Sequence, residues 1–402
     1  MIAVVDSFAR YSRRAAALVV AVILAGPLSA EEPGFSLHGF ATVGATRTDS
    51  RELEFVRDLS QPRGARREWT PNVDSVAGVQ ADWRLTPTLA ATVQAVSRYR
   101  HDRSYAPELA WAFLKYEPTP ELTWRAGRLG TDFFMLADSR LVGYSYLTVR
   151  PPGDFFWHLP FSSIDGVDLV ASRVWGEAVV RGKLFYGATS ARLALADEQW
   201  NIAGSTLAGG YLDYQRGAWQ WRAGYAFLDF SRDLPLQSTL APLLPQPLLG
   251  TALAHLKTAG RRSDYYSLGM VYDQGPWQVQ LMLNRIEQQS AAFESSHAAS
   301  LLLGRRFGAF TPYLGYSLAR SAVKGERLNP VVDRVMADSH VDQRTTTLGV
   351  RWDVAGNTAL KLQWDGVRAA PSSLFPFRED PASGRWSGRM NVYSVTLDYV
   401  FR

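Results

Sequence analysis

Residues 391–402 read NVYSVTLDYVFR and alternate in character from one residue to the next. One face of this segment is apolar and largely aromatic, formed by Tyr393, Val395, Leu397, Tyr399 and Phe401, and the opposite face is polar. A period of two residues is the pattern of a β-strand whose two sides meet different surroundings. Many similar segments precede it, behind an export signal. Such a chain is typical of a transmembrane β-barrel, apolar outside and polar inside.

The N-terminus has the features of a secretory signal peptide. Arg10, Arg13 and Arg14 precede the apolar run 15–25, and Gly26-Pro27-Leu28-Ser29-Ala30 follows it. This order predicts cleavage after Ala30. The alternative, an uncleaved membrane anchor, is disfavoured because the run is shorter than the roughly 20 apolar residues that a spanning helix needs. We therefore expect a leader at 1–30 and a single barrel domain at 31–402.

Composition narrows the class of protein further. The mean hydropathy is −0.13, yet 12% of the residues are aromatic. A barrel reconciles the two, because alternating residues average near zero while each outward face is apolar. The chain has no cysteine, which excludes disulfides and thiol chemistry. The formal charge of +5 falls to +3 without the leader, which carries three Arg and one Asp. A nearly neutral chain of this size gives no indication of a nucleic-acid partner.

Turn residues divide the rest of the chain into sixteen candidate strands, each near the length that crosses a membrane at a tilt. The predicted strands are 35–46, 74–85, 88–99, 107–117, 122–133, 165–175, 178–189, 205–216, 219–230, 264–274, 277–288, 298–308, 310–321, 343–355, 358–370 and 391–402.

The connections between these strands alternate between short and long. Short ones include Thr86-Pro87, Gly176-Glu177 and Gly275-Pro276. The long ones are 47–73, 100–106, 134–164, 190–204, 231–263, 289–297, 322–342 and 371–390. This alternation is typical of a bacterial outer-membrane barrel, with short periplasmic turns and long extracellular loops.

Within single strands the same period assigns the two faces. In 343–355 we expect Leu348, Val350 and Trp352 to face lipid, and Arg351 and Asp353 to face the lumen. Tryptophans gather where short turns meet strands, as expected of a girdle at the periplasmic interface. These are Trp83, Trp124, Trp175, Trp219, Trp277 and Trp352.

The leader, the sixteen strands, the eight long loops and the terminal aromatic strand together resemble the general diffusion porins of Gram-negative bacteria. The resemblance covers the mature chain and rests on pattern rather than on a motif. It implies an outer-membrane channel for small hydrophilic solutes, a homotrimer, contact with outer-membrane lipid and lipopolysaccharide, and assembly machinery that reads the C-terminal strand. Such barrels usually end on an aromatic residue, whereas here Arg402 follows Phe401.

In porins the third extracellular loop commonly folds inward as the constriction. The corresponding loop here, 134–164, carries Asp138, Arg140, Arg150 and Asp154, with proline and glycine to stiffen it and aromatic residues to pack it. We expect it to lie in the lumen; the alternative is packing against other external loops or a neighbouring subunit. Loop 231–263 is long and apolar, and it is a second candidate for a plug or a subunit clamp.

Selectivity would come from charges on the lumen wall. The predicted inward-facing cations include Arg125, Arg181, Lys183, Arg222 and Lys361. The last four are expected at mid-height and predict a weak preference for anions, because basic groups at a constriction favour anion entry. A salt-bridged wall without selectivity is the alternative.

Catalysis finds little support in the sequence. The six histidines are scattered without metal-site spacing, and no nucleophile elbow, phosphate-binding loop or dinucleotide fingerprint occurs. We therefore expect no enzyme, cofactor or metal. The alternatives to a general porin are a substrate-selective channel of 16–18 strands and an outer-membrane enzyme or structural surface barrel.

Overall fold

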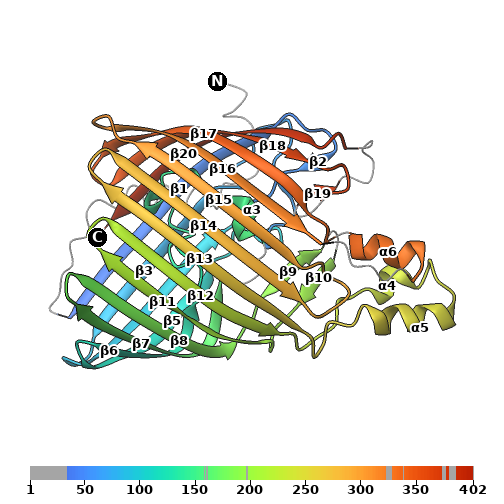
Figure 1. The fold of residues 1–402 in the computed structure, drawn as a ribbon, viewed down its shortest axis with the longest axis horizontal. Coiled ribbons are helices and arrows are strands. Elements are labelled where there is room, and N and C mark those ends of the chain that lie inside the picture. Colours follow the sequence, from blue (N-terminus) through green and yellow to red (C-terminus); the bar gives the residue numbers. More distant parts are fainter. Residues whose placement is uncertain are drawn as a thin grey trace.

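The alternating segments form strands in the computed structural model of the chain, which describes residues 34–157, 159, 162–195, 198–322, 328–337, 339–373, 377–379 and 386–401. Within these residues, sixteen antiparallel strands close into one barrel (Figure 1). The predicted fold class and strand count are therefore confirmed, and the alternative of eighteen strands is wrong. The predicted leader and Arg402 lie outside the described residues, so the division into 1–30 and 31–402 remains a prediction.

Each barrel strand pairs with the next in the chain, and the first pairs with the last to close the ring. The barrel strands are β1 (Phe35–Thr48), β3 (Val76–Arg84), β4 (Leu89–Arg98), β5 (Glu108–Thr119), β6 (Leu122–Gly130), β7 (Ser163–Trp175), β8 (Ala178–Ala188), β11 (Thr206–Arg216), β12 (Trp219–Asp229), β13 (Arg262–Gln274), β14 (Trp277–Gln288), β15 (Ser296–Arg305), β16 (Phe310–Ser321), β17 (Asp342–Ala355), β18 (Thr358–Ala369) and β20 (Arg389–Phe401).

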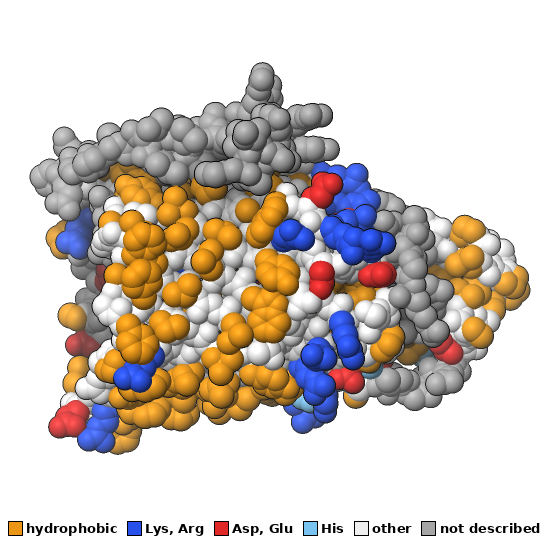
Figure 2. Space-filling model, turned by 90° about the horizontal axis from the view of Figure 1, so that it is seen from above, with side chains coloured by type: hydrophobic (Ala, Val, Ile, Leu, Met, Phe, Trp, Pro, Cys, Tyr) orange, Lys and Arg blue, Asp and Glu red, His pale blue; other side chains and the backbone are white. Residues whose placement is uncertain are grey.

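The outer surface of the barrel is apolar over most of its height (Figure 2). In β17, Leu348 lies between Leu314 of β16 and Trp364 of β18 on the outward face. Leu348 itself is 47% exposed in the isolated chain. Leaving such surface in water costs roughly 25 cal/mol per Å². A lipid environment removes that cost, as expected for a spanning barrel.

Short turns connect the strands at one end of the barrel. Gly176, Gly217, Gly275 and Gly308 sit in four of these turns with φ between 56° and 60°, a left-handed conformation that glycine adopts without steric cost. The six tryptophans of the predicted girdle are all exposed beside these turns. The paired strands β1 and β20 bring the first and last described residues to this same end.

Long loops occupy the other end and carry further short elements. They contain β2 (Leu53–Glu54), β9 (Arg192–Leu195), β10 (Glu198–Asn201), β19 (Arg378–Glu379), η1 (Gly143–Ser145), α3 (Gly153–Phe156), α4 (Gln237–Leu240), α5 (Gln246–His255) and α6 (Pro330–Ala337). Among the described residues, no helix is long and apolar enough to cross a membrane.

The loop that we named as a second candidate plug does not enter the lumen. Its helices α4 and α5 lie with α6 beyond the end of the barrel (Figure 1). Leu240, Leu249 and Leu256 pack there against Val332 and Met336 of the α6 segment. The apolar side chains that suggested a plug therefore form a small external core.

Candidate channel constriction

The connection between β6 and β7 runs inside the barrel. It spans residues 131–162, because β6 ends three residues earlier and β7 begins two residues earlier than predicted. The hydroxyl of Tyr144 donates to the carbonyl of Gly356 in the short turn between β17 and β18, at 2.8 Å. The amide of Asn284 on β14 donates to the carbonyl of Phe155 at 3.0 Å. The lumen-facing side of the wall thus binds the loop along its length.

The entry of the loop into the lumen is fixed by aromatic packing. Phe133 and Phe134 are fully buried and contact each other, and Phe133 also contacts Phe185 of β8 and Tyr265 of β13. The guanidinium of Arg222 on β12 donates to the carbonyl of Asp132 at 2.7 Å. Burying these rings offsets the entropy lost when the loop is ordered.

Glycines on the inward face of the wall make room for the loop. A Cβ at Gly224 of β12 would lie 2.2 Å from the carbonyl oxygen of Phe133, and one at Gly269 of β13 would lie 2.4 Å from Met135 Cβ. A Cβ at Gly304 of β15 would lie 2.4 Å from Leu147. Inward-facing glycines are thus a sequence signal for the wall against which the loop packs.

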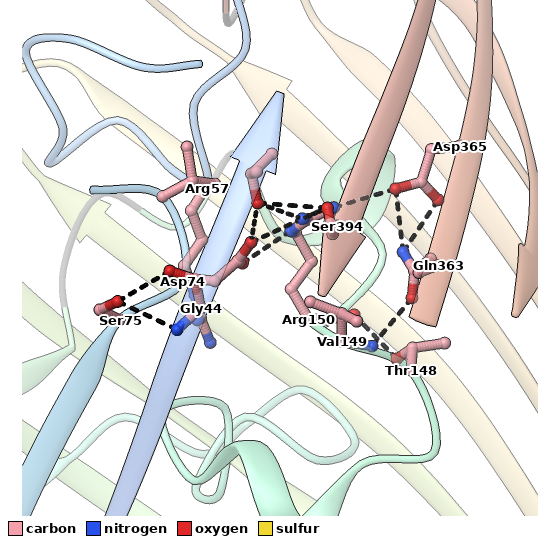
Figure 3. Close-up of polar contacts among 12 residues, drawn as sticks. Gly44, Arg57, Asp74, Ser75, Thr148, Val149, Arg150, Gln363, Asp365 and Ser394 are labelled. Atoms are coloured by element: carbon pink, nitrogen blue, oxygen red, sulfur yellow. Dashed lines mark hydrogen bonds and ion pairs between the residues drawn. The ribbon is translucent and has the colours of Figure 1, made fainter. Parts of the chain in front are cut away.

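Arg150 is the central anchor of the loop (Figure 3). Its guanidinium lies 2.7 Å from Asp74 Oδ2 and 2.9 Å from Asp365 Oδ2 of β18, and it also donates to the hydroxyl of Ser394 on β20. The side chain is 3% exposed. Burial lowers the pKa of Arg150, but the two carboxylates raise it more, so the net shift is upward. A cation held this way stays charged. Through it, β18, β20 and the first loop all bind one residue of the β6–β7 loop.

Lys361 of β18 forms a second anchor. Its ammonium donates to the carbonyls of Gly143 at 2.7 Å and Thr148 at 3.0 Å, and it lies 3.0 Å from Asp398 Oδ2 of β20. The Lys361 side chain is fully buried. It therefore gives a partner to the Thr148 carbonyl and a second donor to the Gly143 carbonyl, which also accepts from the N–H of Tyr146 at 3.1 Å.

Asp154 docks the helical turn α3 against the wall. Its carboxylate accepts from the hydroxyl of Ser317 on β16 at 2.6 Å and from the amide of Gln343 on β17. Burial raises the pKa of Asp154, and these donors oppose the rise. Trp157 packs over Gly153, where a Cβ would lie 2.7 Å from the indole ring. Asp154 is therefore a docking group of the loop.

The remaining predicted wall cations are ion paired, with one exception. Arg125 lies 2.6 Å from Asp168, and Lys183 lies 3.0 Å from the same carboxylate and also contacts Asp132 of the loop. Arg222 lies 2.7 Å from Asp213. Arg181 faces the lumen beside Asp213 in the strand register and is exposed.

Two further predicted residues, Asp138 and Arg140, lie in the loop just before η1. Asp138 is exposed and accepts from the backbone N–H of Ser139 at 2.9 Å. The carbonyl of Arg140 accepts from the guanidinium of Arg57 in the first loop at 2.6 Å. Burial lowers the pKa of both Arg57 and Arg140, the latter to about 10.

Burial divides the lumen into two walls. On β14–β20 the loop covers many of the inward side chains, so that Ser300, Ser317, Gln363 and Thr396 are buried, while Thr345 and Thr347 of β17 are half-buried. On β3, β5 and β6 several inward side chains are half-buried, namely Gln80, Trp111, Phe113, Lys115 and Arg125, whereas the inward Thr92 and Gln94 of β4 are buried. The solvent-accessible part of the lumen therefore lies against β3–β6, which we call the open wall.

The loop approaches the open wall at Leu141 and Val142. Both pack against an apolar cluster on the inward face, which contains Phe40 of β1, Val96 of β4 and Trp111 of β5. These residues could not be singled out from the sequence, because the alternating pattern does not distinguish an apolar side chain that faces the lumen from one that faces lipid.

The first and fourth loops meet above the open wall. Arg98 at the end of β4 lies 3.2 Å from Asp58 of the first loop. The N–H of Ala194 in β9 donates to the carbonyl of Leu59 at 3.3 Å. Because β4–β7 separate these two loops around the ring, this contact crosses the outer mouth of the barrel. We refer to the contact between 57–60 and 192–195 as the mouth bridge.

The described residues contain no group of three or more His, Cys, Asp or Glu that could hold a metal ion.

Comparisons with known proteins agree with this fold. No protein-family model matches the chain, and no curated protein matches it. Among solved structures, OmpT of Vibrio cholerae is 13% identical with a TM-score of 0.55, covering 92% of this chain and 99% of that one. An anion-selective porin from Comamonas acidovorans is 14% identical with a TM-score of 0.54, covering 91% and 99%. OmpF of Salmonella typhi, in complex with daunomycin, is 12% identical with a TM-score of 0.56, covering 91% and 97%. The chain thus has the fold of Gram-negative outer-membrane porins.

The Arg150 anchor gives a first prediction. Arg150→Ala leaves Asp74 and Asp365 buried without their cation, which costs about 3–5 kcal/mol. We expect a lower unfolding temperature in detergent and a larger, noisier single-channel current as the loop leaves the wall. Arg181→Ala is the matched control, because it removes the same charge from an exposed position. Equal currents and equal unfolding temperatures in both variants would contradict the anchor.

The mouth bridge gives a second prediction, helped by the absence of native cysteines. In the double variant Leu59→Cys/Ala194→Cys we expect mild oxidation to join the two loops, because hydrogen-bonded backbones place side chains within disulfide range. Mass spectrometry of a tryptic digest would detect the cross-linked peptide. Leu59→Cys/Leu243→Cys is the control, since Leu243 is exposed on the external helical loop. A cross-link that forms equally in the control would show that the bridge is not specific.

Proposed function

We propose that this protein is a porin of the Gram-negative outer membrane that lets small hydrophilic solutes diffuse passively through its lumen. The observation that carries the proposal is the packing of loop 131–162 against one wall, with half-buried polar residues facing it from the other. A sixteen-stranded barrel is wide enough for an aqueous channel, and an inward loop narrows it. The apolar outer band and the expected leader are consistent with this location.

We propose that the narrowest part lies between the loop and the wall formed by β3–β6. Leu141 and Val142 approach Phe40 and Trp111 there, with Arg140 and Asp138 nearby on the loop. A partly apolar constriction holds water less firmly than a charged one. Passage should therefore depend strongly on solute size.

In this proposal four buried cations mainly stabilise the packing of the loop and the wall. They are Arg150, Lys183, Arg222 and Lys361. The last three, with Arg181, are the residues from which the sequence predicted an anion preference. Each of the four buried cations is paired with a carboxylate, so its electrostatic field in the lumen is largely cancelled. Arg84 and Arg181 are exposed cations near the short-turn end. We infer that any anion preference is weak and arises at the periplasmic mouth.

We also propose a homotrimer. One solved form of the similar Vibrio cholerae OmpT is described as a trimer. The outer wall offers a continuous apolar surface on which further copies could pack. The solved structures of this fold named above are porins, which supports a channel rather than an enzyme.

Reconstitution tests the function directly. Mature protein in a planar bilayer should give discrete ohmic current steps, and liposomes that carry it should swell faster in arabinose than in the larger sugar stachyose. A KCl gradient should give a small reversal potential of the sign for anions, and Arg84→Gln/Arg181→Gln should bring it closer to zero. A folded barrel that passes neither ions nor arabinose would refute the channel.

A further inference from the structure

One apolar row interrupts the polar lining of the lumen where β1, β3 and β4 pair. Phe40 of β1 and Val96 of β4 lie in register on either side of Gly78 of β3. The ring of Phe40 covers this glycine, since a Cβ at Gly78 would lie 2.4 Å from the ring. Side chains of β5 and of the β6–β7 loop pack against the row. We call the whole set the apolar seam, and its members are Phe40, Val96, Trp111, Leu141 and Val142.

Polar side chains border the apolar seam on both sides along the barrel. Toward the long loops, the next inward residue of β4 is Arg98, whose guanidinium lies 3.2 Å from Asp58 and 3.3 Å from Glu108. Toward the short turns, the next inward row contains Gln80 and Gln94, which share a hydrogen bond of 2.9 Å. The seam is therefore a short apolar step in a polar passage.

Charges of both signs surround the seam. Arg140 and Asp138 precede it on the loop. On the open wall, Lys115 lies 2.9 Å from Glu117 of the same strand. Opposite charges this close largely cancel each other's field in a wet lumen. A net charge on a solute therefore changes its passage over the seam little, and the apolar side chains remain as the feature that can distinguish solutes.

The seam favours solutes that have an apolar group. Trp111, Leu141 and Val142 are half-buried, so part of each faces the passage. Water is held weakly beside such side chains. A wholly polar solute loses hydration there and gains no hydrogen bond in return, which is costly. A solute with an apolar ring displaces this water and buries the ring against Trp111 and Leu141, which is favourable.

We propose that the channel selects, among small solutes without net charge, those that carry one apolar ring and a polar end. The ring crosses the seam while the polar end stays among the polar rows on either side. An aromatic amino acid zwitterion represents this class. The inference rests on the channel proposed above and adds the class of solute that passes it best.

Uptake of two amino acids by proteoliposomes tests the proposal. L-phenylalanine and L-glutamine are both zwitterions at neutral pH, but phenylalanine is the larger and has an apolar side chain. A pore that sorts solutes by size alone admits glutamine faster. We expect wild-type protein to admit phenylalanine about threefold faster than glutamine, because burial of the ring lowers its barrier. Uptake by protein-free liposomes is subtracted from both rates.

Two variants make the seam polar with little change in side-chain size. Leu141→Asn/Val142→Thr changes the loop side, and we expect it to admit glutamine faster than phenylalanine. Val96→Thr changes the wall and leaves the loop sequence intact, so it also serves if the loop variant does not fold; the phenylalanine-to-glutamine ratio should fall toward one. Leu243→Asn/Val331→Thr is the control, because it makes the same exchanges in the external helical loops. Its ratio should match wild type.

Single-channel conductance of each preparation separates this inference from the channel proposal. Wild-type protein that conducts but admits glutamine as fast as phenylalanine, or faster, would overturn the solute preference and leave the channel standing. An unchanged ratio in both seam variants, or an equal loss in the control, would do the same. Wild-type protein that neither conducts nor admits either amino acid would refute the channel, and the solute preference with it.

Discussion

The guanidinium of Arg150, held between the carboxylates of Asp74 and Asp365, is the interaction on which the interior of this barrel depends. A loop placed inside a barrel must satisfy its own polar groups and those of the wall that it covers, since buried groups without partners are costly. Arg150 forms ion pairs with carboxylates from the first loop and from β18, and Lys361 donates hydrogen bonds to two carbonyls of the loop. The aromatic residues at the start of the loop add apolar contact to these polar anchors. Together they hold about thirty residues against one side of the lumen.

This arrangement changes the meaning of the charges in the lumen. Counted along the sequence, lysines and arginines at mid-height suggest a surface that attracts anions. In the folded chain Lys183, Arg222 and Lys361 lie beside Asp168, Asp213 and Asp398, so their main effect is structural. Discrimination among solutes then depends more on the space between the loop and β3–β6, and on the mouth bridge above it, than on a net field.

The strands could be predicted from the sequence because their signal is local. Period two, glycine turns and the tryptophan girdle all act over a few residues, and the strand boundaries agree with the structure to within a few positions. The path of loop 131–162 could be expected only through the resemblance to porins. Its anchors could not be predicted, since Arg150 is 76 residues from Asp74 and 215 from Asp365. The helices of the external loop were missed because their apolar residues favoured a plug and nothing local indicated a separate core. The apolar contact of Leu141 and Val142 likewise depends on the fold alone.

The most direct test of this account is the reactivity of single cysteines toward a charged, water-soluble thiol reagent during current recording. The chain has no cysteine of its own, so each substitution reports on one position. Lys115→Cys lies on the open wall and Ser300→Cys lies beneath the loop. We predict that the reagent reacts quickly at position 115 and reduces the current, and that position 300 stays unmodified while the loop is docked. Equal reactivity at both positions, or faster reaction at 300, would contradict a lumen divided by the loop into a covered wall and an open one.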